Sequence, residues 1–128
     1  MIRDAVALPG LTPDLPLSPA IRAGGLIHVT GMTGARPGGA MPDDPREQFH
    51  AAWAKIAAVL KAAGTNLRAV VDVTSYHVEI DDTFPAFEAV LRERLTPPYP
   101  AWTAVGVAAL RRPGALAEIK VVATDPAG

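Results

Sequence analysis

Several residue types and patterns are missing from this sequence, and each absence narrows what the protein can be. The chain has no cysteine, which excludes disulfide bonds, thiolate nucleophiles and sulfur-ligated metal sites. No apolar run approaches the roughly 20 residues of a membrane-spanning helix, and residues 1–10 lack the pattern of a secretion signal. The net charge of -1 comes without a basic patch, so we expect neither a nucleic-acid nor a membrane partner.

The remaining composition is that of an ordinary globular domain. Hydrophobic residues make up 49% of the 128 positions and charged residues 20%. A chain of this length buries about two thirds of its unfolded surface, which is enough for one core. We therefore expect a single domain over residues 1–128, located in the cytoplasm, because a chain without cysteine suits a reducing compartment.

The clearest element is a helix that begins after Asp44. Asp44 can cap it, Pro45 suits its first position, and Gly64 ends it. Apolar residues recur along it at the spacing of one buried face. The other expected elements are a short edge strand within residues 2–8, strands at 26–32 and 70–80, and a second helix at 84–95 that Asp82 or Thr83 would cap.

The last quarter of the chain predicts two further strands. Alternating small and β-branched residues flank Arg111–Gly114, and turn residues between two such runs are typical of a β-hairpin. Glu118 lies in the second run among apolar neighbours. A carboxylate in such a strand either faces solvent or is held in a cleft, where it could position and deprotonate a water molecule.

This order of elements predicts an α+β fold in which two helices pack on one face of a mixed sheet. The strands nevertheless carry apolar residues on both parities, such as Val73 against Val70 and Val105 against Ala104. An exposed apolar sheet face is rare on a monomer. We therefore expect the second face to meet another copy of the chain.

Six segments resemble successive blocks of the RidA family, also called YjgF/YER057c/UK114. They cover the chain in order from about residue 14 to its end and are Pro16–Ala20, Arg22–Gly31, Val59–Gly64, Phe84–Phe87, Tyr99–Ala101 and Gly114–Ile119. The resemblance implies a chorismate-mutase-like fold of the bacillary type, assembled as a homotrimer with clefts between subunits. It also implies cofactor-free hydrolysis of reactive imines and enamines to ketones and ammonia.

The resemblance also implies site residues. Glu118 takes the position of the glutamate that directs water, and Thr30 that of a hydroxyl residue beside a glycine; both would be catalytic. The implied substrate-binding residues are Leu17, Gly31, Phe87, Glu88, Trp102, Thr103 and Ala104. No metal is expected, because the three histidines show no ligand spacing.

Trp102 is the main departure from the family pattern. The family's deaminases have an arginine there that pairs with the substrate carboxylate, whereas an indole offers one N–H and an apolar face. We therefore expect a more apolar or aromatic substrate. Arg22, Arg111 or Arg112 could replace the missing arginine, although nothing in the sequence places them in the cleft.

Each assignment has an alternative. Glu118 could be an exposed carboxylate paired with Lys120, and Glu88 could pair with Arg92 one helical turn away. Trp102 could be a core residue. The alternative to a hydrolase is a non-catalytic homotrimer that binds a small metabolite in an inactive cleft.

Overall fold

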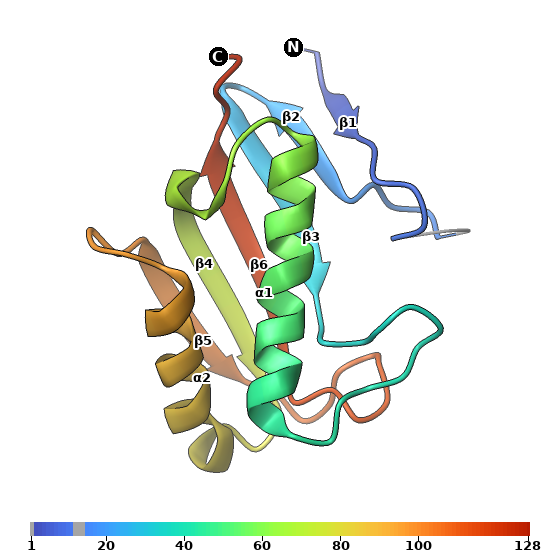
Figure 1. The fold of residues 1–128 in the computed structure, drawn as a ribbon, viewed down its shortest axis with the longest axis vertical. Coiled ribbons are helices and arrows are strands. Elements are labelled where there is room, and N and C mark those ends of the chain that lie inside the picture. The colour runs from blue at the N-terminus through green and yellow to red at the C-terminus, as the bar shows by residue number, and fades with distance from the viewer. Residues whose placement is uncertain (1, 12–14) are drawn as a thin grey trace.

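The computed structural model describes residues 2–11 and 15–128, which form one mixed sheet covered by two helices. The sheet order is β1-β2-β3-β6-β4-β5. Its strands are β1 (Asp4–Val6), β2 (Ala20–Ala23), β3 (Leu26–Met32), β4 (Val70–His77), β5 (Ala101–Gly106) and β6 (Ala117–Thr124). Helices α1 (Pro45–Ala62) and α2 (Ile80–Arg94) both lie in front of the sheet in Figure 1, and a 3-10 turn, η1 (Leu67–Ala69), precedes β4. The predicted α+β class is confirmed.

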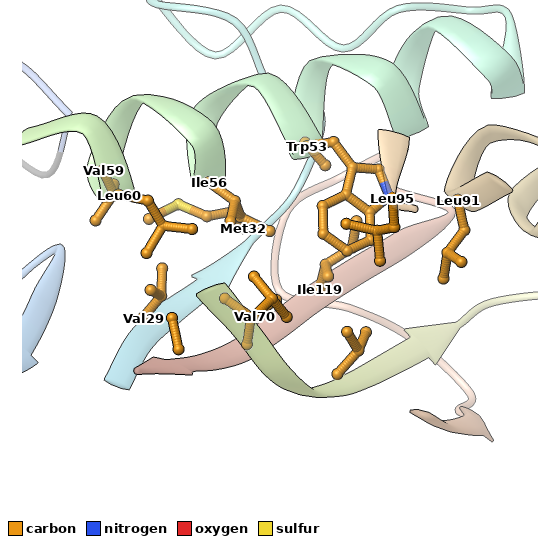
Figure 2. Packing of buried hydrophobic residues seen from close by; sticks show 14 of the residues in the cluster. Val29, Met32, Trp53, Ile56, Val59, Leu60, Val70, Leu91, Leu95 and Ile119 are labelled. Atoms are coloured by element: carbon orange, nitrogen blue, oxygen red, sulfur yellow. The ribbon is translucent and has the colours of Figure 1, made fainter. Parts of the chain in front are cut away.

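Helix α1 provides the largest part of the core. The Asp44 side chain accepts a hydrogen bond from the Arg46 N–H at 2.9 Å, as expected of an N-cap. Trp53, Ile56 and Leu60 are fully buried on the face of α1 that meets the sheet. Figure 2 shows the Trp53 indole pointing from α1 toward Ile119 of β6. The helical spacing read from the sequence therefore identifies the core face correctly.

The expected hairpin in the last quarter is wrong. Strands β5 and β6 do not pair with each other, because β4 lies between them. β5 is parallel to β4 and reaches it through α2, whereas β6 is antiparallel to β4. Parallel neighbours require a crossover, and here the crossover is a helix. The segment at 107–116 is consequently a loop between separated strands, and it carries Arg111 and Arg112 past the end of the sheet.

Two local features shift the expected boundaries. α2 begins at Ile80, ahead of the expected cap, after Glu79 adopts a left-handed φ of 54°. The Thr83 hydroxyl donates to the Glu79 carbonyl at 3.1 Å instead of capping the helix. In β4, a register shift between Val70 and Asp72 brings Val70 and Val73 to the same buried face and leaves Val71 exposed. A bulge of this kind interrupts the strict alternation of side chains between the two faces of the sheet.

The two faces of the sheet differ in character. In β6, Ala117, Ile119, Val121 and Ala123 are buried beneath the helices, whereas Glu118 and Lys120 belong to the opposite face. That opposite face mixes apolar with polar side chains, and no helix of the described residues covers it. The apolar face inferred from the sequence is therefore interrupted by polar groups such as His28 and Asp72, both exposed.

Candidate functional site

Glu118 is the second residue of β6, the strand that lies between β3 and β4 in the sheet. It is opposite Tyr76 of β4 and is partly buried. Within the described part of the chain, the Glu118 carboxylate forms no ion pair, and Lys120 does not reach it. The carboxylate is therefore partly removed from solvent without being neutralised by a direct contact.

Gly31 allows the Glu118 carboxylate to take this position. A Cβ added at Gly31 would lie 2.6 Å from Glu118 Oε2 and 3.0 Å from Cδ. These distances are too short for a real side chain, so the missing Cβ creates the space that the carboxylate occupies. The β3–β6 register also shifts between Val29 and Met32, at the point where Gly31 faces Glu118. Bulges often re-aim side chains beside functional sites.

Glu118 and Gly31 line a cavity of about 300 Å³ together with residues from the N-terminal segment, α1 and the loop between β5 and β6. Leu17 and Thr30, which the sequence also selects, line the same cavity. Its remaining walls are Leu11, Leu15, Met32, Thr33, Lys55, Arg111 and Arg112. Four of the residues selected from the sequence therefore come together in one cavity. Lys55, Arg111 and Arg112 also line it, and the sequence alone did not place these three cations there.

Thr30 fixes the loop that carries Leu17. Its hydroxyl donates to the Ser18 carbonyl at 2.5 Å, and its backbone N–H donates to the Pro19 carbonyl at 2.9 Å. The Thr30 proton is therefore engaged, while its oxygen can still accept a hydrogen bond from a ligand. Leu17 stays 41% exposed and presents an apolar side chain to the cavity.

Two of the other sequence-selected residues, Phe87 and Glu88, lie beside Trp102 of β5. The Trp102 ring stacks on Phe84 with centroids 5.3 Å apart and planes inclined by 4°, and it lies 5.9 Å from Phe87. Both phenylalanines belong to α2, so the indole packs on the helix side of the sheet. Trp102 is partly buried. Phe87 is fully buried, which makes it a support for the tryptophan rather than an exposed binding surface.

A buried hydrogen-bond chain fixes the indole. The Trp102 Nε1–H donates to Ser75 Oγ at 2.8 Å, and Ser75 Oγ lies 2.7 Å from His77 Nε2. An indole can only donate, so the Ser75 oxygen accepts from it and the Ser75 proton is available to His77. Burial lowers the pKa of His77 and favours its neutral form. The single N–H of Trp102 is thus used inside the protein.

A smaller cavity of about 210 Å³ lies beside Trp102. It is lined by Glu88, Leu91, Arg92, Tyr99, Pro100 and Trp102. The Glu88 carboxylate accepts a hydrogen bond from Arg92 at 3.2 Å, and Arg92 lies over the Tyr99 ring, 6.0 Å from its centroid. Glu88 therefore pairs with Arg92, and it borders a cavity other than the one that Glu118 lines.

Thr103 and Ala104 lie on β5, the last strand of the sheet. The Val107 N–H donates inward to the His77 carbonyl at 2.8 Å. Successive N–H groups of a strand point to opposite edges, so the Ala104 N–H, three residues before Val107, points to the free edge. Thr103 is exposed and shares a face with Thr74 of β4. These two residues line neither of the cavities around Glu118 and Trp102.

Sequence reasoning missed two sets of residues. Lys55 received no role because a lysine on an amphipathic helix is usually solvated, and Ser75 gave no signal within an ordinary strand. Of the arginines considered, Arg111 and Arg112 do reach the Glu118 cavity. Arg22 does not, because it pairs with Asp125 at 2.7 Å and donates to the Ala63 carbonyl.

Other features of the structure add no candidate chemistry. The residues described include no group of three histidine, aspartate or glutamate side chains arranged to hold a metal ion. None of the helices in the described ranges is long and apolar enough to cross a membrane. A larger cavity of about 510 Å³ lies beside the proline-rich connection at 96–100, and it contains none of the residues selected from the sequence.

Comparison with known proteins places this arrangement in a family. Residues 10–125 match the family described as Endoribonuclease L-PSP. The RutC family protein YjgH of Escherichia coli is 41% identical over 110 residues, which cover 85% of this chain and 82% of that protein. A 2-iminobutanoate/2-iminopropanoate deaminase of Dermatophagoides farinae is 31% identical over 97 residues, covering 74% and 75% of the two chains.

Solved structures agree in fold over nearly the whole chain. A structure described as protein YJGH superposes with a TM-score of 0.88 at 39% identity and covers 97% of both chains. Rv2704 of Mycobacterium tuberculosis, described as a member of the YjgF/YER057c/UK114 family, superposes with a TM-score of 0.82 at 28% identity and covers 96% of this chain and 99% of its own. The match therefore extends over sequence, sheet order and helices alike, and this chain belongs to the RidA (YjgF/YER057c/UK114) family.

Proposed function

We propose that this protein is a cofactor-free hydrolase of reactive imines and enamines, with Glu118 as the residue that positions and deprotonates water. The observation that carries the proposal is the Glu118 carboxylate, held against Gly31 at the wall of a cavity and without an ion-pair partner among the described residues. A general base needs an unneutralised carboxylate at a fixed position. Membership of the RidA family and the deaminase relative at 31% identity support this reaction class.

The reaction is a hydrolysis in which every atom is accounted for. Water adds its oxygen to the carbon of the C=N bond while Glu118 accepts one of its protons. Glu118 passes this proton to the imine nitrogen, which gives a neutral carbinolamine. Glu118 then accepts the hydroxyl proton and passes it to the amino nitrogen as the C–N bond breaks, so that ammonia leaves and the carbonyl group of the ketone forms. The Thr30 oxygen, whose own proton is donated to Ser18, accepts a hydrogen bond from the imine N–H and orients the substrate.

The complete site is proposed to lie between protomers of a homotrimer. Within one chain, Glu118 and Trp102 line two different cavities, so a cleft that uses both needs residues from two chains. β5 ends the sheet and carries Thr103 and the outward Ala104 N–H, and this free edge is available to another copy. Light scattering should give a mass about three times the 13.4 kDa of the chain, and a monomer at micromolar concentration would contradict this arrangement.

The proposed substrates have an apolar or aromatic body. Leu17 presents an apolar side chain to the Glu118 cavity, and the indole of Trp102 and the ring of Tyr99 border the other. Since the Trp102 N–H is donated to Ser75, the indole cannot take over the carboxylate binding of the arginine that the family's deaminases have there. Small acidic imines, which lack an apolar body to contact these side chains, should be poor substrates.

The test measures ammonia release from imines generated in situ by an amino-acid oxidase, with small acidic and aromatic side chains. Glu118→Gln should lower the rate by about 100-fold or more, which is the usual contribution of a general base. Glu47→Gln is the matched control, because this exposed carboxylate contacts only Arg36, at 3.5 Å. Trp102→Arg should gain activity on small acidic imines. Full activity of Glu118→Gln would overturn the mechanism and favour a protein that only binds metabolites.

A further inference from the structure

Three cations surround the Glu118 cavity, and none of them is neutralised by an ion pair within the ranges described. Lys55 comes from α1, and Arg111 and Arg112 come from the loop between β5 and β6. Among the described residues, the only carboxylate lining the cavity is Glu118. The described part of the lining thus has three positive charges against one negative charge, although the chain as a whole has a net charge of -1.

Lys55 is the best-placed of these cations. It is partly buried, and its ammonium group donates to the Ala35 carbonyl at 2.9 Å, which leaves two of its protons free. Burial, followed by the charge of Arg112, lowers the pKa of Lys55, while Glu118 acts in the opposite direction. A second negative charge in the cavity would relieve the repulsion between Lys55 and Arg112.

The arginine loop is held in place by the same helix. The buried side chain of Gln48 donates to the Gly114 carbonyl at 3.0 Å and accepts from the Leu116 N–H at 3.0 Å. Gln48 and Lys55 are seven residues apart, two turns along one side of α1. α1 therefore sets the position of the lysine and also anchors the loop that carries Arg111 and Arg112. The positions of all three cations are fixed by contacts with this helix.

We propose that Lys55, Arg111 and Arg112 form an anion-binding subsite, which holds a carboxylate of the substrate beside Glu118. This subsite would replace the arginine that Trp102 has displaced and would lie in a different part of the cleft. The substrate class then becomes an imine with an apolar or aromatic body and one carboxylate. The identity of the ligand rests on the proposed imine hydrolysis, whereas the binding of an anion by these residues does not.

Direct binding tests the subsite without relying on catalysis. The probe is phenylpyruvate, an aromatic 2-oxo acid, and its neutral counterpart is phenylacetone, in which a methyl group replaces the carboxylate. Calorimetry should show that Lys55→Met and Arg112→Gln each weaken phenylpyruvate binding by about 10-fold, as expected for charge-assisted hydrogen bonds, and leave phenylacetone binding unchanged. Lys55→Arg should retain most of the affinity.

Lys61→Met is the matched control, because Lys61 is an exposed lysine on the same helix outside the cavity. It should not change the binding of either compound. Binding of phenylpyruvate by Lys55→Met and by an Arg111→Gln/Arg112→Gln double variant as tightly as by the wild type would overturn the inference. An equal loss of phenylacetone binding in these variants would also overturn it, because the effect would then be one of structure and not of charge.

Glu118→Gln separates the subsite from the proposed reaction. Removing the negative charge of Glu118 should tighten phenylpyruvate binding while it lowers the rate of imine hydrolysis by about 100-fold or more. If the wild type binds phenylpyruvate through Lys55 but hydrolyses no imine, the proposed function fails and the subsite remains. If the wild type hydrolyses aromatic imines but binds phenylpyruvate no more tightly than the Lys55 and arginine variants do, the subsite fails and the proposed function remains.

Discussion

The cavity around Glu118 and the cluster around Trp102 differ in how their polar groups are satisfied. At Glu118 the charged groups can still form further hydrogen bonds. The carboxylate has no ion pair in the described ranges, and Lys55 donates one of its three ammonium protons to a hydrogen bond within the described ranges. At Trp102 the indole N–H, the Ser75 hydroxyl and His77 Nε2 are all joined in one buried chain. His77 Nδ1 is an exception, because this buried atom has no hydrogen-bond partner among the described residues. Groups with free hydrogen-bonding capacity can act on a ligand, whereas groups that are joined to one another hold a structure together.

This difference assigns separate tasks to the two regions. The Glu118 cavity should respond to mutation in activity more than in stability, because its groups interact weakly with one another. The Trp102 cluster should respond in stability, because its hydrogen bonds and aromatic contacts are buried. Mutations that reverse this pattern would show that the contrast is wrong.

After Glu118→Gln itself, the largest effect on activity should come from Gly31→Ala. The added Cβ would need the space that Glu118 Oε2 occupies 2.6 Å away, so the carboxylate must move. A displacement of about 1 Å at a reacting group lowers the rate by about 100-fold. The φ of Gly31 is not in the left-handed region, so the alanine adds no backbone strain. The rate of ammonia release checks this expectation.

A double-mutant comparison shows whether Gly31 acts through Glu118. If it does, Gly31→Ala should have almost no further effect on the rate in a Glu118→Gln background, because the two changes remove the same contribution. Additive effects in the double variant would mean that the alanine disturbs the cavity in some other way.

The largest effect on stability should come from Ser75→Ala. This change leaves the Trp102 N–H and His77 Nε2 without their shared partner in a fully buried position. An unsatisfied buried polar group costs about 1–3 kcal/mol. Urea denaturation measures the loss, and activity per folded molecule should stay close to that of the wild type. A loss of stability below about 0.5 kcal/mol would contradict the structural role of the chain, given that estimate.

A pH dependence of stability should appear at His77. Burial lowers its pKa, so at a pH below the ordinary value of 6.5 the unfolded chain binds a proton that the folded chain does not bind. The free energy of unfolding should therefore fall as the pH decreases from 6.5, by at most about 1.4 kcal/mol per pH unit. His77→Gln should flatten this part of the curve.

Glu93 gives a second pH window, which begins at a lower pH than the first. The hydrogen bond from Arg46 lowers the pKa of the Glu93 carboxyl, so its stabilisation is present above the ordinary value of 4.5 and is lost only below it. Loss of stability between pH 6.5 and 4.5 that persists unchanged in His77→Gln would show that His77 is not its source.

The sequence was most informative where a local pattern determines the structure. The spacing of apolar residues after Asp44 identified the buried face of α1, which includes Phe49, Trp53 and Ile56, and the order of elements predicted the α+β class. Pairing between distant strands was not accessible, because the run before Arg111 and the run after Gly114 look like a hairpin until β4 is inserted between them. Such a choice depends on the crossover through α2, a long-range feature without a local signal.

The candidate site was likewise predictable in part. Leu17, Thr30, Gly31 and Glu118 were selected from the family segments and line one cavity. Lys55 was not selected, because its position depends on how α1 lies against the loop at Ala35, which it contacts at 2.9 Å. Residue type alone does not distinguish a lysine at a cavity from one in solvent.

The smallest effect should come from Glu88→Gln, at the rim of the Trp102 cluster. Glu88 and Arg92 form an exposed pair one helical turn apart, with 41% and 62% of their side-chain surfaces accessible. Pairs of this kind contribute about 0.3–0.5 kcal/mol and are screened by salt. Glu88→Gln should therefore lower the free energy of unfolding by a few tenths of a kcal/mol at low salt and by less in about 0.5 M sodium chloride.

If Glu88 only borders the cavity, the hydrolysis of aromatic imines by Glu88→Gln should stay within about twofold of the wild-type rate, well short of the loss expected for a general base. A decrease in activity as large as that of Gly31→Ala, with the same small change in stability, would instead place Glu88 with Glu118 in the reaction, and the division between the two regions would have to be given up.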